Sequence, residues 1–285
     1  MNKLKGSRVL SFVAVISVYV AAAVVGIFTF RCFDSSVFLA LLIADVLATV
    51  FVFLFSLIFK NASVYDPYWS VQPIVILSCF LFGREISVLG ILLVLTVFLW
   101  GIRLTANWAY TFKGLNFQDW RYTMLSEKTG KFYPIINFVG IHMVPTLIVY
   151  AVTVPALYVI MYGGTLNPYS VISLSVSLLA VTLQCVSDMQ MHRYRKDRNT
   201  PFIRNGLWKY SRHPNYLGEI MMWWGIGFAA FFAFTDKPLL LIGAFLNTLL
   251  FLFVSIPMAD KRQSRKEGFD EYKKHTRMLL PIGRK

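Results

Sequence analysis

Long hydrophobic runs constrain the fold of this chain more than any other feature. Eight of them can be drawn, at roughly 9–30, 37–59, 71–82, 86–108, 134–161, 169–190, 214–234 and 238–258 of 285 residues. An α-helix needs about 20 apolar residues to cross the hydrocarbon core of a bilayer, and most of these runs reach that length. They predict an all-α, polytopic integral membrane bundle that forms a single membrane domain over residues 1–285. We expect seven or eight transmembrane helices, because 71–82 is short and carries Pro73.

The distribution of basic residues predicts which ends of the helices face the cytoplasm. Eight crossings that start from a cytoplasmic N-terminus leave only Arg31, Arg84 and Lys237 of the 28 Lys and Arg in outer loops. Because cytoplasmic loops are enriched in Lys and Arg, we expect both termini to be cytoplasmic. Orientation and attraction to anionic lipid then account for the net charge of +14. The lipid bilayer is therefore an expected partner, and nucleic acid is not.

Common signatures of soluble cofactor domains are absent from the sequence. No GxGxxG or Walker pattern occurs, so a nucleotide, if bound, is expected inside the helical bundle. Cys32, Cys79 and Cys185 lie inside or beside apolar runs and form no CxxC pair. Neither a disulfide nor a metal site is predicted from them.

The segment from Gly206 to Glu219 carries Arg, His, Asn, Tyr and Glu where a cytosolic loop meets a hydrophobic run. Ionisable groups at membrane depth are costly, so such a cluster indicates a binding site. Pro214 is expected to begin a helix, because proline lacks the N–H group that would have no partner there. The free N–H groups of that first turn, beside Arg212 and His213, predict a seat for an anion.

Polar side chains recur at helical spacing near the cytoplasmic ends of other runs. The clusters are Arg103 with Asn107 and Tyr110, Asp188 with His192 and Arg195, Asn215 with Glu219 and Met222, and Asp66 before Pro73. One such stripe alone is more typical of a polar clamp between helices. Because all four fall on the same side, we expect them to gather around one cavity in the inner leaflet. Asp45, an acid inside 37–59, has no partner that the sequence identifies.

The chemistry of these groups fits a ligand that is rich in phosphate and has a second polar end. Arginine forms bidentate contacts with phosphate, and the candidates are Arg103, Arg195, Arg204 and Arg212. Asn215 and Glu219 are suited to an amide or a ribose hydroxyl.

The segment Gly206–Glu219, in the form GLWxYSRHPNYxGE followed by Trp223 and Trp224, resembles the steroid 5-alpha-reductase family. The likeness is to the C-terminal domain of that family, in its largely uncharacterised bacterial branch. Further points of likeness are Asp188, Arg195, the tetrapeptide Phe269-Asp270-Glu271-Tyr272 and Leu280-Pro281. Upstream, Asp66 lies where the family has the Glu of a Gln-Glu-Leu-Pro-Ser motif. The resemblance covers residues 60–285 and is weak over 1–60.

The resemblance implies a transmembrane bundle that holds NADPH from the cytosolic side and takes a lipophilic substrate from the membrane. It also implies a location in the bacterial inner membrane. The residues expected to bind the nucleotide are Arg103, Asn107, Asp188, Arg195, Arg204, Arg212, His213, Asn215, Tyr216 and Glu219. The catalytic candidates are Asp66, Tyr65 and Trp100. Trp100 stands where the reductases have a Tyr, and an indole donates a hydrogen bond but cannot transfer a proton.

The expected function is NADPH-dependent reduction of a conjugated carbon–carbon double bond in a membrane-soluble enone. Hydride would reach the β-carbon while Asp66, kept protonated by apolar surroundings, polarises the carbonyl. Two alternatives are a methyltransferase that uses S-adenosylmethionine on a lipid or prenylated thiol, and a non-catalytic lipid-binding protein. The first shares the core Arg212-His213-Pro214. For Asp66 itself, the alternative is a cap on the turn before Pro67.

Overall fold

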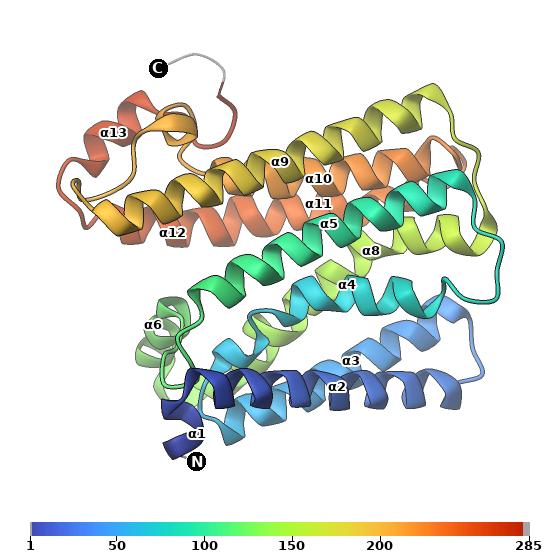
Figure 1. The fold of residues 1–285 in the computed structure, drawn as a ribbon, viewed down its shortest axis with the longest axis horizontal. Helices are drawn as coiled ribbons and strands as arrows, with labels where there is room; N and C mark the ends of the chain where they lie inside the picture. The colour runs from blue at the N-terminus through green and yellow to red at the C-terminus, as the bar shows by residue number, and fades with distance from the viewer. Residues whose placement is uncertain (1, 282–285) are drawn as a thin grey trace. The chain divides into compact units, whose positions relative to one another are not determined.

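The computed structural model describes residues 2–281, which contain helices and no strand (Figure 1). The main helices are α2 (Arg8–Cys32), α3 (Val37–Ile58), α4 (Tyr68–Cys79), α5 (Val88–Thr111), α8 (Val144–Tyr162), α9 (Pro168–Asp197), α10 (Pro214–Phe231), α11 (Ile242–Leu250) and α12 (Ile256–Gln263). The other α-helices are α1 (Asn2–Gly6), α6 (Trp120–Thr129), α7 (Tyr133–Ile136) and α13 (Phe269–His275). Short 3₁₀-helices are η1 (Ala62–Tyr65), η2 (Gly130–Phe132), η4 (Gly206–Lys209) and η5 (Pro238–Leu241), and the π-helical segments are η3 (Asn137–Met143) and η6 (Phe251–Ser255). The predicted all-α fold is confirmed.

Within residues 2–281, six helical stretches are long and apolar enough to cross a membrane. They are Arg8–Cys32, Val37–Ile58, Val88–Thr111, Trp120–Tyr162, Pro168–Asp197 and Pro238–Gln263. The other two predicted crossings are the helices α4, of 12 residues with Pro73 inside it, and α10, of 18 residues. The chain is therefore a polytopic helical membrane protein, as the apolar runs predict. The exact number of crossings and their orientation stay predictions.

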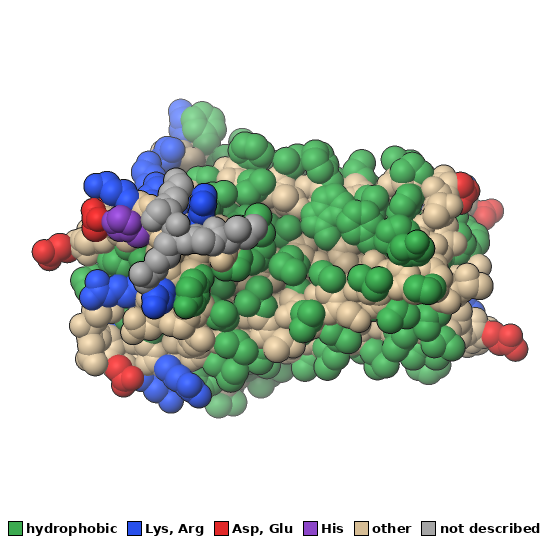
Figure 2. All heavy atoms as spheres, turned by 90° about the horizontal axis from the view of Figure 1, so that it is seen from above, with side chains coloured by type: hydrophobic (Ala, Val, Ile, Leu, Met, Phe, Trp, Pro, Cys, Tyr) green, Lys and Arg blue, Asp and Glu red, His purple; other side chains and the backbone are tan. Residues whose placement is uncertain are grey.

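The surface of the long helices is suited to lipid. On α2, Ile16, Val20 and Val24 follow one another at intervals of four residues, so they share one face, and they are 59%, 60% and 61% exposed. Figure 2 shows hydrophobic side chains over the middle of one face of the molecule, with Lys and Arg gathered towards one end. In a polytopic membrane protein, large aliphatic side chains exposed in this way are suited to contact with acyl chains of the bilayer.

Local sequence signals explain where several of these helices begin. Ser7 and Ser36 accept hydrogen bonds from the backbone N–H groups three residues later, Leu10 and Leu39, both at 3.3 Å. Asn167 does the same for the N–H of Ser170 at 3.0 Å, immediately before the proline that opens α9. Side-chain caps of this kind satisfy N–H groups that a helix start leaves without a partner.

The helices form two compact units, which are described separately. Unit 1 consists of Met1–Gly83 and Trp100–Val154, and unit 2 of Arg84–Leu99 and Pro155–Lys285. Helices α5 and α8 each contribute residues to both. The expectation of a single membrane domain stays a prediction.

In unit 1, hydrogen bonds between hydroxyl groups connect α3, η1 and α8 in an otherwise hydrophobic interior. The side chain of Thr146 on α8 lies 3.0 Å from the hydroxyl of Thr49 on α3 and 2.8 Å from that of Tyr65 in η1. All three residues are buried, so each hydroxyl satisfies another without water. This chain of hydrogen bonds fixes η1, and with it the segment that carries Asp66.

In unit 2, α9 and α10 run side by side (Figure 1), and small residues let their backbones approach closely. A Cβ atom added at Gly225 would lie 2.6 Å from the carbonyl oxygen of Ser173. One at Gly218 would lie 2.8 Å from that of Ala180. The hydroxyl of Ser177 donates across the same interface to the carbonyl of Met222, at 3.0 Å. The interface therefore depends on glycine at these positions.

We expect Gly225→Ala to lower the stability of unit 2 by about 1–3 kcal/mol, because overpacking against a rigid backbone carbonyl has that typical cost. Gly227→Ala on the same helix is the matched control, since its Cβ would meet a flexible side chain, Leu241, at 3.3 Å. Thermal unfolding of both variants in detergent measures the difference. Equal melting temperatures for Gly225→Ala and the unmodified protein would contradict close packing of these helices.

Candidate functional site

The loop that carries the predicted motif is docked on the C-terminal end of α9. Gly206 has φ of +61°, a conformation that favours glycine, and a Cβ there would collide with the side chain of Gln190. The same glutamine accepts a hydrogen bond from the N–H of Leu207 at 2.9 Å. The indole of Trp208 donates to the carbonyl of Ser187 at 3.3 Å. The next helix, α10, begins at Pro214, as the sequence predicts.

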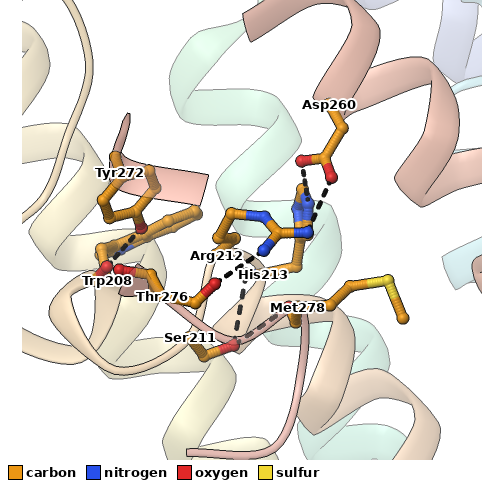
Figure 3. A network of polar contacts seen from close by, with 8 residues as sticks. All are labelled: Trp208, Ser211, Arg212, His213, Asp260, Tyr272, Thr276 and Met278. Carbon is orange, nitrogen blue, oxygen red and sulfur yellow. Dashed lines mark hydrogen bonds and ion pairs between the residues drawn. The ribbon is translucent and has the colours of Figure 1, made fainter. Parts of the chain in front are cut away.

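An acid on α12 organises the basic pair of the motif (Figure 3). Asp260 accepts a hydrogen bond from Nη2 of Arg212 at 2.9 Å, and its other oxygen lies 2.9 Å from Nε2 of His213. All three side chains are at most 10% exposed. A carboxylate held between a guanidinium and an imidazole in such a place fixes both side chains in one geometry.

The same loop is joined to the segment after α13. The N–H of Arg212 donates to the carbonyl of Arg277 at 2.9 Å, and its Nη1 donates to the carbonyl of Thr276 at 2.7 Å. Ser211 reaches the carbonyl of Met278, at 3.4 Å, and Tyr272 donates to the carbonyl of Trp208 (Figure 3). The resemblance connects these two regions in the sequence, and the hydrogen bonds show how they meet.

The observed contacts of Arg212 and His213 are with the protein itself. The role in nucleotide binding that the sequence predicts for them stays a prediction, and what the structure shows is a role in holding the loop. Sequence reasoning missed Asp260, which lies 48 residues from Arg212. The signal available for it was an acid among the basic residues that follow the last apolar run.

We expect Asp260→Asn to destabilise the loop by about 1.5–3 kcal/mol, the usual worth of hydrogen bonds to a charged partner. Hydrogen exchange should rise in residues 206–214 and 276–278 together, because Asp260 holds the Arg212 side chain that joins them. Asp270→Asn, at an exposed acid of α13, is the control. Unchanged exchange in both segments of Asp260→Asn would contradict this role.

The first turns of α10 present further polar groups. The rings of His213 and Tyr216 stack with centroids 5.2 Å apart. Glu219, which is 6% exposed, accepts a hydrogen bond from the indole of Trp223 at 2.9 Å. The side-chain oxygen of Asn215 is buried and has no hydrogen-bond partner within residues 2–281. It is an open acceptor at the helix start where the sequence predicts a bound ligand.

A basic hollow lies where α9 ends. We call it the arginine hollow; it has a volume of about 310 Å³. It is lined by Gln190, Arg193, Tyr194, Asp197, Arg198, Asn199, Thr200, Ile203, Arg204, Asn205 and Gly206. Three arginines and one aspartate line it, so the hollow is suited to an anion. Arg204 was predicted as a ligand-binding residue and lines it, whereas Arg195 does not.

The surroundings of the arginine hollow are also positively charged. Burial lowers the pKa of Lys266, and the nearby cations Arg262, Arg198 and Arg195 lower it further. A lysine whose pKa is lowered by neighbours reports an excess of positive potential at that place. Arg195 therefore contributes to the potential around the hollow from an exposed position.

In unit 1, Asp66 lies in a polar cluster built from two distant segments. Its Oδ1 accepts a hydrogen bond of 2.6 Å from the hydroxyl of Tyr122 on α6. Burial raises the pKa of Asp66 to about 6, while the nearby Arg121 and the hydrogen bond from Tyr122 act in the opposite direction. The carboxyl group thus gains and loses a proton close to neutral pH, the property that suits an acid catalyst.

The other predicted catalytic residues have different surroundings. The hydroxyl of Tyr65 is engaged with Thr146, at 2.8 Å, and Trp100 on α5 is fully buried. The phenol that contacts Asp66 belongs instead to Tyr122, which sequence reasoning missed. Tyr122 lies 56 residues from Asp66 in a short amphipathic helix, so no local pattern joins the two.

The predicted nucleotide residues Arg103 and Asn107 lie on the part of α5 that belongs to unit 1. Between them, the hydroxyl of Thr105 lies 2.8 Å from that of Ser70 at the start of α4. This contact brings the Arg103–Asn107 stretch beside the segment that follows Asp66. The remaining nucleotide candidates, from Asp188 to Glu219, belong to unit 2, so their gathering in one cavity stays a prediction.

Comparison with known proteins identifies the family. Residues 52–276 match the model of the family described as "Protein of unknown function (DUF1295)". The chain belongs to this family. An uncharacterised protein of the fission yeast Schizosaccharomyces pombe, C594.04c, is 28% identical in an alignment of 211 positions that covers 64% of this chain and 60% of that protein. No solved structure matches the chain.

These relatives carry limited functional information. The chain spans less than two thirds of the length of the yeast protein that it matches. Because that relative is eukaryotic, the bacterial inner membrane stays a prediction, while integral membrane character follows from the six apolar helices. The likeness to steroid 5-alpha-reductases in particular stays a prediction as well.

Proposed function

We propose that this DUF1295 protein is a membrane-bound, NADPH-dependent reductase of a conjugated carbon–carbon double bond in a lipophilic enone. The observation that carries the proposal is the arginine hollow. NADPH has a 2′-phosphate and a pyrophosphate, and Arg193, Arg198 and Arg204 are the groups suited to bind phosphate. The open acceptor of Asn215 supplies a second polar contact in the same unit, suited to an amide or a hydroxyl donor of the nucleotide.

The arginine hollow also favours a reductase that binds NADPH over a methyltransferase that binds S-adenosylmethionine. S-adenosylmethionine carries no phosphate, and its sulfonium and ammonium outweigh its one carboxylate, so a set of arginines attracts it less than it attracts NADPH.

The residues of unit 1 supply the acid that the reaction needs. When bound, NADPH provides a hydride for the β-carbon of the enone, and a proton reaches the α-carbon to complete the saturated ketone. Asp66, in its protonated form, donates a hydrogen bond to the carbonyl oxygen and stabilises the negative charge that develops there. Tyr122, which donates to the same carboxyl group, positions it.

Binding of nucleotides to the purified protein in nanodiscs tests the proposal. We expect NADPH to bind at micromolar concentration, seen as a change in its fluorescence, and S-adenosylhomocysteine neither to bind nor to displace it. Absence of binding by both NADPH and NADH would reject the reductase. Tight binding of S-adenosylhomocysteine alone would establish the methyltransferase instead.

A further inference from the structure

Unit 1 contains a second pocket, which the proposed reaction does not use. It lies among α2, α3 and α4 and has a volume of about 340 Å³. Most of its wall is hydrophobic, and small residues such as Ala22 and Gly26 on α2 and Ala44 and Ala48 on α3 leave the space open. Its size is within the range of pockets that bind small molecules. We call it the α2–α4 pocket.

The α2–α4 pocket is long and narrow. Its lining residues on α2 run from Tyr19 to Arg31, which at 1.5 Å per residue is about 18 Å along the helix. The exposed residues Ile27 and Cys79 belong to its wall, so the pocket opens at the surface of the unit. An elongated hydrocarbon group fits such a space.

The polar part of the α2–α4 pocket is built around Asp45, the acid for which the sequence showed no partner. The structure supplies two. The hydroxyl of Tyr68 donates to Oδ1 at 3.3 Å, and the amide of Gln72 donates to Oδ2. Asp45 is 6% exposed, and each of its carboxyl oxygens therefore already has a donor.

Gln72, in the wall of the α2–α4 pocket, has one hydrogen-bond acceptor that lacks a donor. The residue is 4% exposed and lines the pocket, and its Nε2 is used by Asp45. Its Oε1 is buried and has no hydrogen-bond partner within the described residues. A buried acceptor without a donor costs free energy, so a ligand that donates there is stabilised. A ligand of the α2–α4 pocket should therefore donate a hydrogen bond to Oε1 of Gln72.

We propose that the α2–α4 pocket binds a lipophilic alcohol, whose hydroxyl donates to Oε1 of Gln72 while its hydrocarbon part lies along α2. A carboxylate or phosphate has only acceptor atoms to offer, and it would meet the carboxyl group of Asp45 beside Gln72. A hydrocarbon or an ether would leave the acceptor unsatisfied. The proposal uses unit 1 alone and needs no nucleotide, so it goes beyond the proposed reduction and stands if that fails.

Photo-crosslinking of the full-length protein in phosphatidylcholine nanodiscs tests the proposal. The probes are a hexadecanol that carries a diazirine and an alkyne, its methyl ether, and the corresponding carboxylic acid. We expect the alcohol to label peptides of α2, α3 or α4 in a saturable way. The ether and the acid should label them at least about tenfold less, which corresponds to the loss of one good hydrogen bond.

Two variants locate the contact. Gln72→Leu removes the acceptor and should lower labelling by the alcohol about tenfold while labelling by the ether is unchanged. Ala23→Phe, at a half-buried wall position, should block labelling by filling the space. Thr153→Val is the control, because it removes a buried hydroxyl of unit 1 that bonds a carbonyl of its own helix and does not line the pocket.

Several results of these experiments would overturn the proposed alcohol site. Equal labelling by alcohol and ether, stronger labelling by the acid, or labelling that does not saturate would overturn the proposal. So would unchanged labelling in well-folded Gln72→Leu or in Ala23→Phe. If Gln72→Leu does not fold, the comparison of the three probes on the unmodified protein and on Ala23→Phe still decides. Nucleotide binding is measured in parallel, and its absence has no bearing on these results.

Discussion

Asp66→Ala should lower turnover severely while NADPH binds as it does to the unmodified protein. An acid that polarises the reacting carbonyl contributes about 10²- to 10⁴-fold to the rate, so kcat should fall by that factor. Asp66→Asn keeps a hydrogen-bond donor and should retain partial activity. Glu127→Gln, at an exposed acid of α6, is the control and should change neither quantity. An active, well-folded Asp66→Ala would remove Asp66 from the mechanism.

The dependence on pH separates this role from a turn cap. The donor is the protonated carboxyl, whose pKa burial raises to about 6. Turnover should therefore be highest below pH 6 and decline as pH rises through that value. Tyr122→Phe removes a hydrogen bond that favours the carboxylate, so the decline should move to higher pH. A turn cap predicts instead that activity follows the amount of folded protein in every variant, with no shift in the profile.

Arg193→Ala combined with Arg204→Ala should weaken NADPH binding by about 100-fold or more. Each charge-assisted contact is commonly worth about 1.5–3 kcal/mol, and 1.4 kcal/mol is tenfold in affinity. The unmodified protein should prefer NADPH to NADH by at least about tenfold, because the 2′-phosphate adds the negative charge that the arginine hollow is suited to bind. The double variant should lose most of that preference. Fluorescence titration with both nucleotides measures it.

The effect of overall charge on nucleotide binding must be distinguished from the effect of the arginines that line the hollow. Lys273→Ala combined with Lys274→Ala removes the same charge from the exposed face of α13, in the same unit, and should leave both affinities nearly unchanged. Arg195→Ala should have an intermediate effect, since Arg195 adds to the potential around the hollow without lining it. Equal losses in all three variants would show general attraction rather than a site.

Features with a local cause could be predicted from the sequence. Hydrophobic runs of the right length gave the long helices, and the restricted backbone of proline gave the start of α10 at Pro214. The short helix α4 contains Pro73, in agreement with the expectation of a short or interrupted element. The loop at Gly206–Glu219 is indeed a dense polar structure. In each case the cause lies within a few residues of the effect.

Partnerships between distant segments could not be predicted. Asp260 with Arg212, Tyr122 with Asp66, and Gln72 with Asp45 are joined across 48, 56 and 27 residues. Helical periodicity states which face a residue occupies but not which helix that face meets. Asp45 is the clearest example, because an acid without a visible partner proves to be the centre of a polar cluster. The role of Arg212 as a contact to Asp260 was hidden for the same reason.

The hydrogen bonds from Arg212 to Thr276 and Arg277 have a consequence for biosynthesis. A chain emerges from the ribosome in order, so α9, the motif loop and α10 are synthesised before residues 276–278 exist. Until then the carbonyl partners of Arg212 are missing, and its guanidinium can be held by Asp260 alone once α12 is in place. The loop therefore completes its hydrogen bonding late, after the helices around it are inserted. Folding of unit 2 should therefore end at the motif loop rather than in its hydrophobic interior.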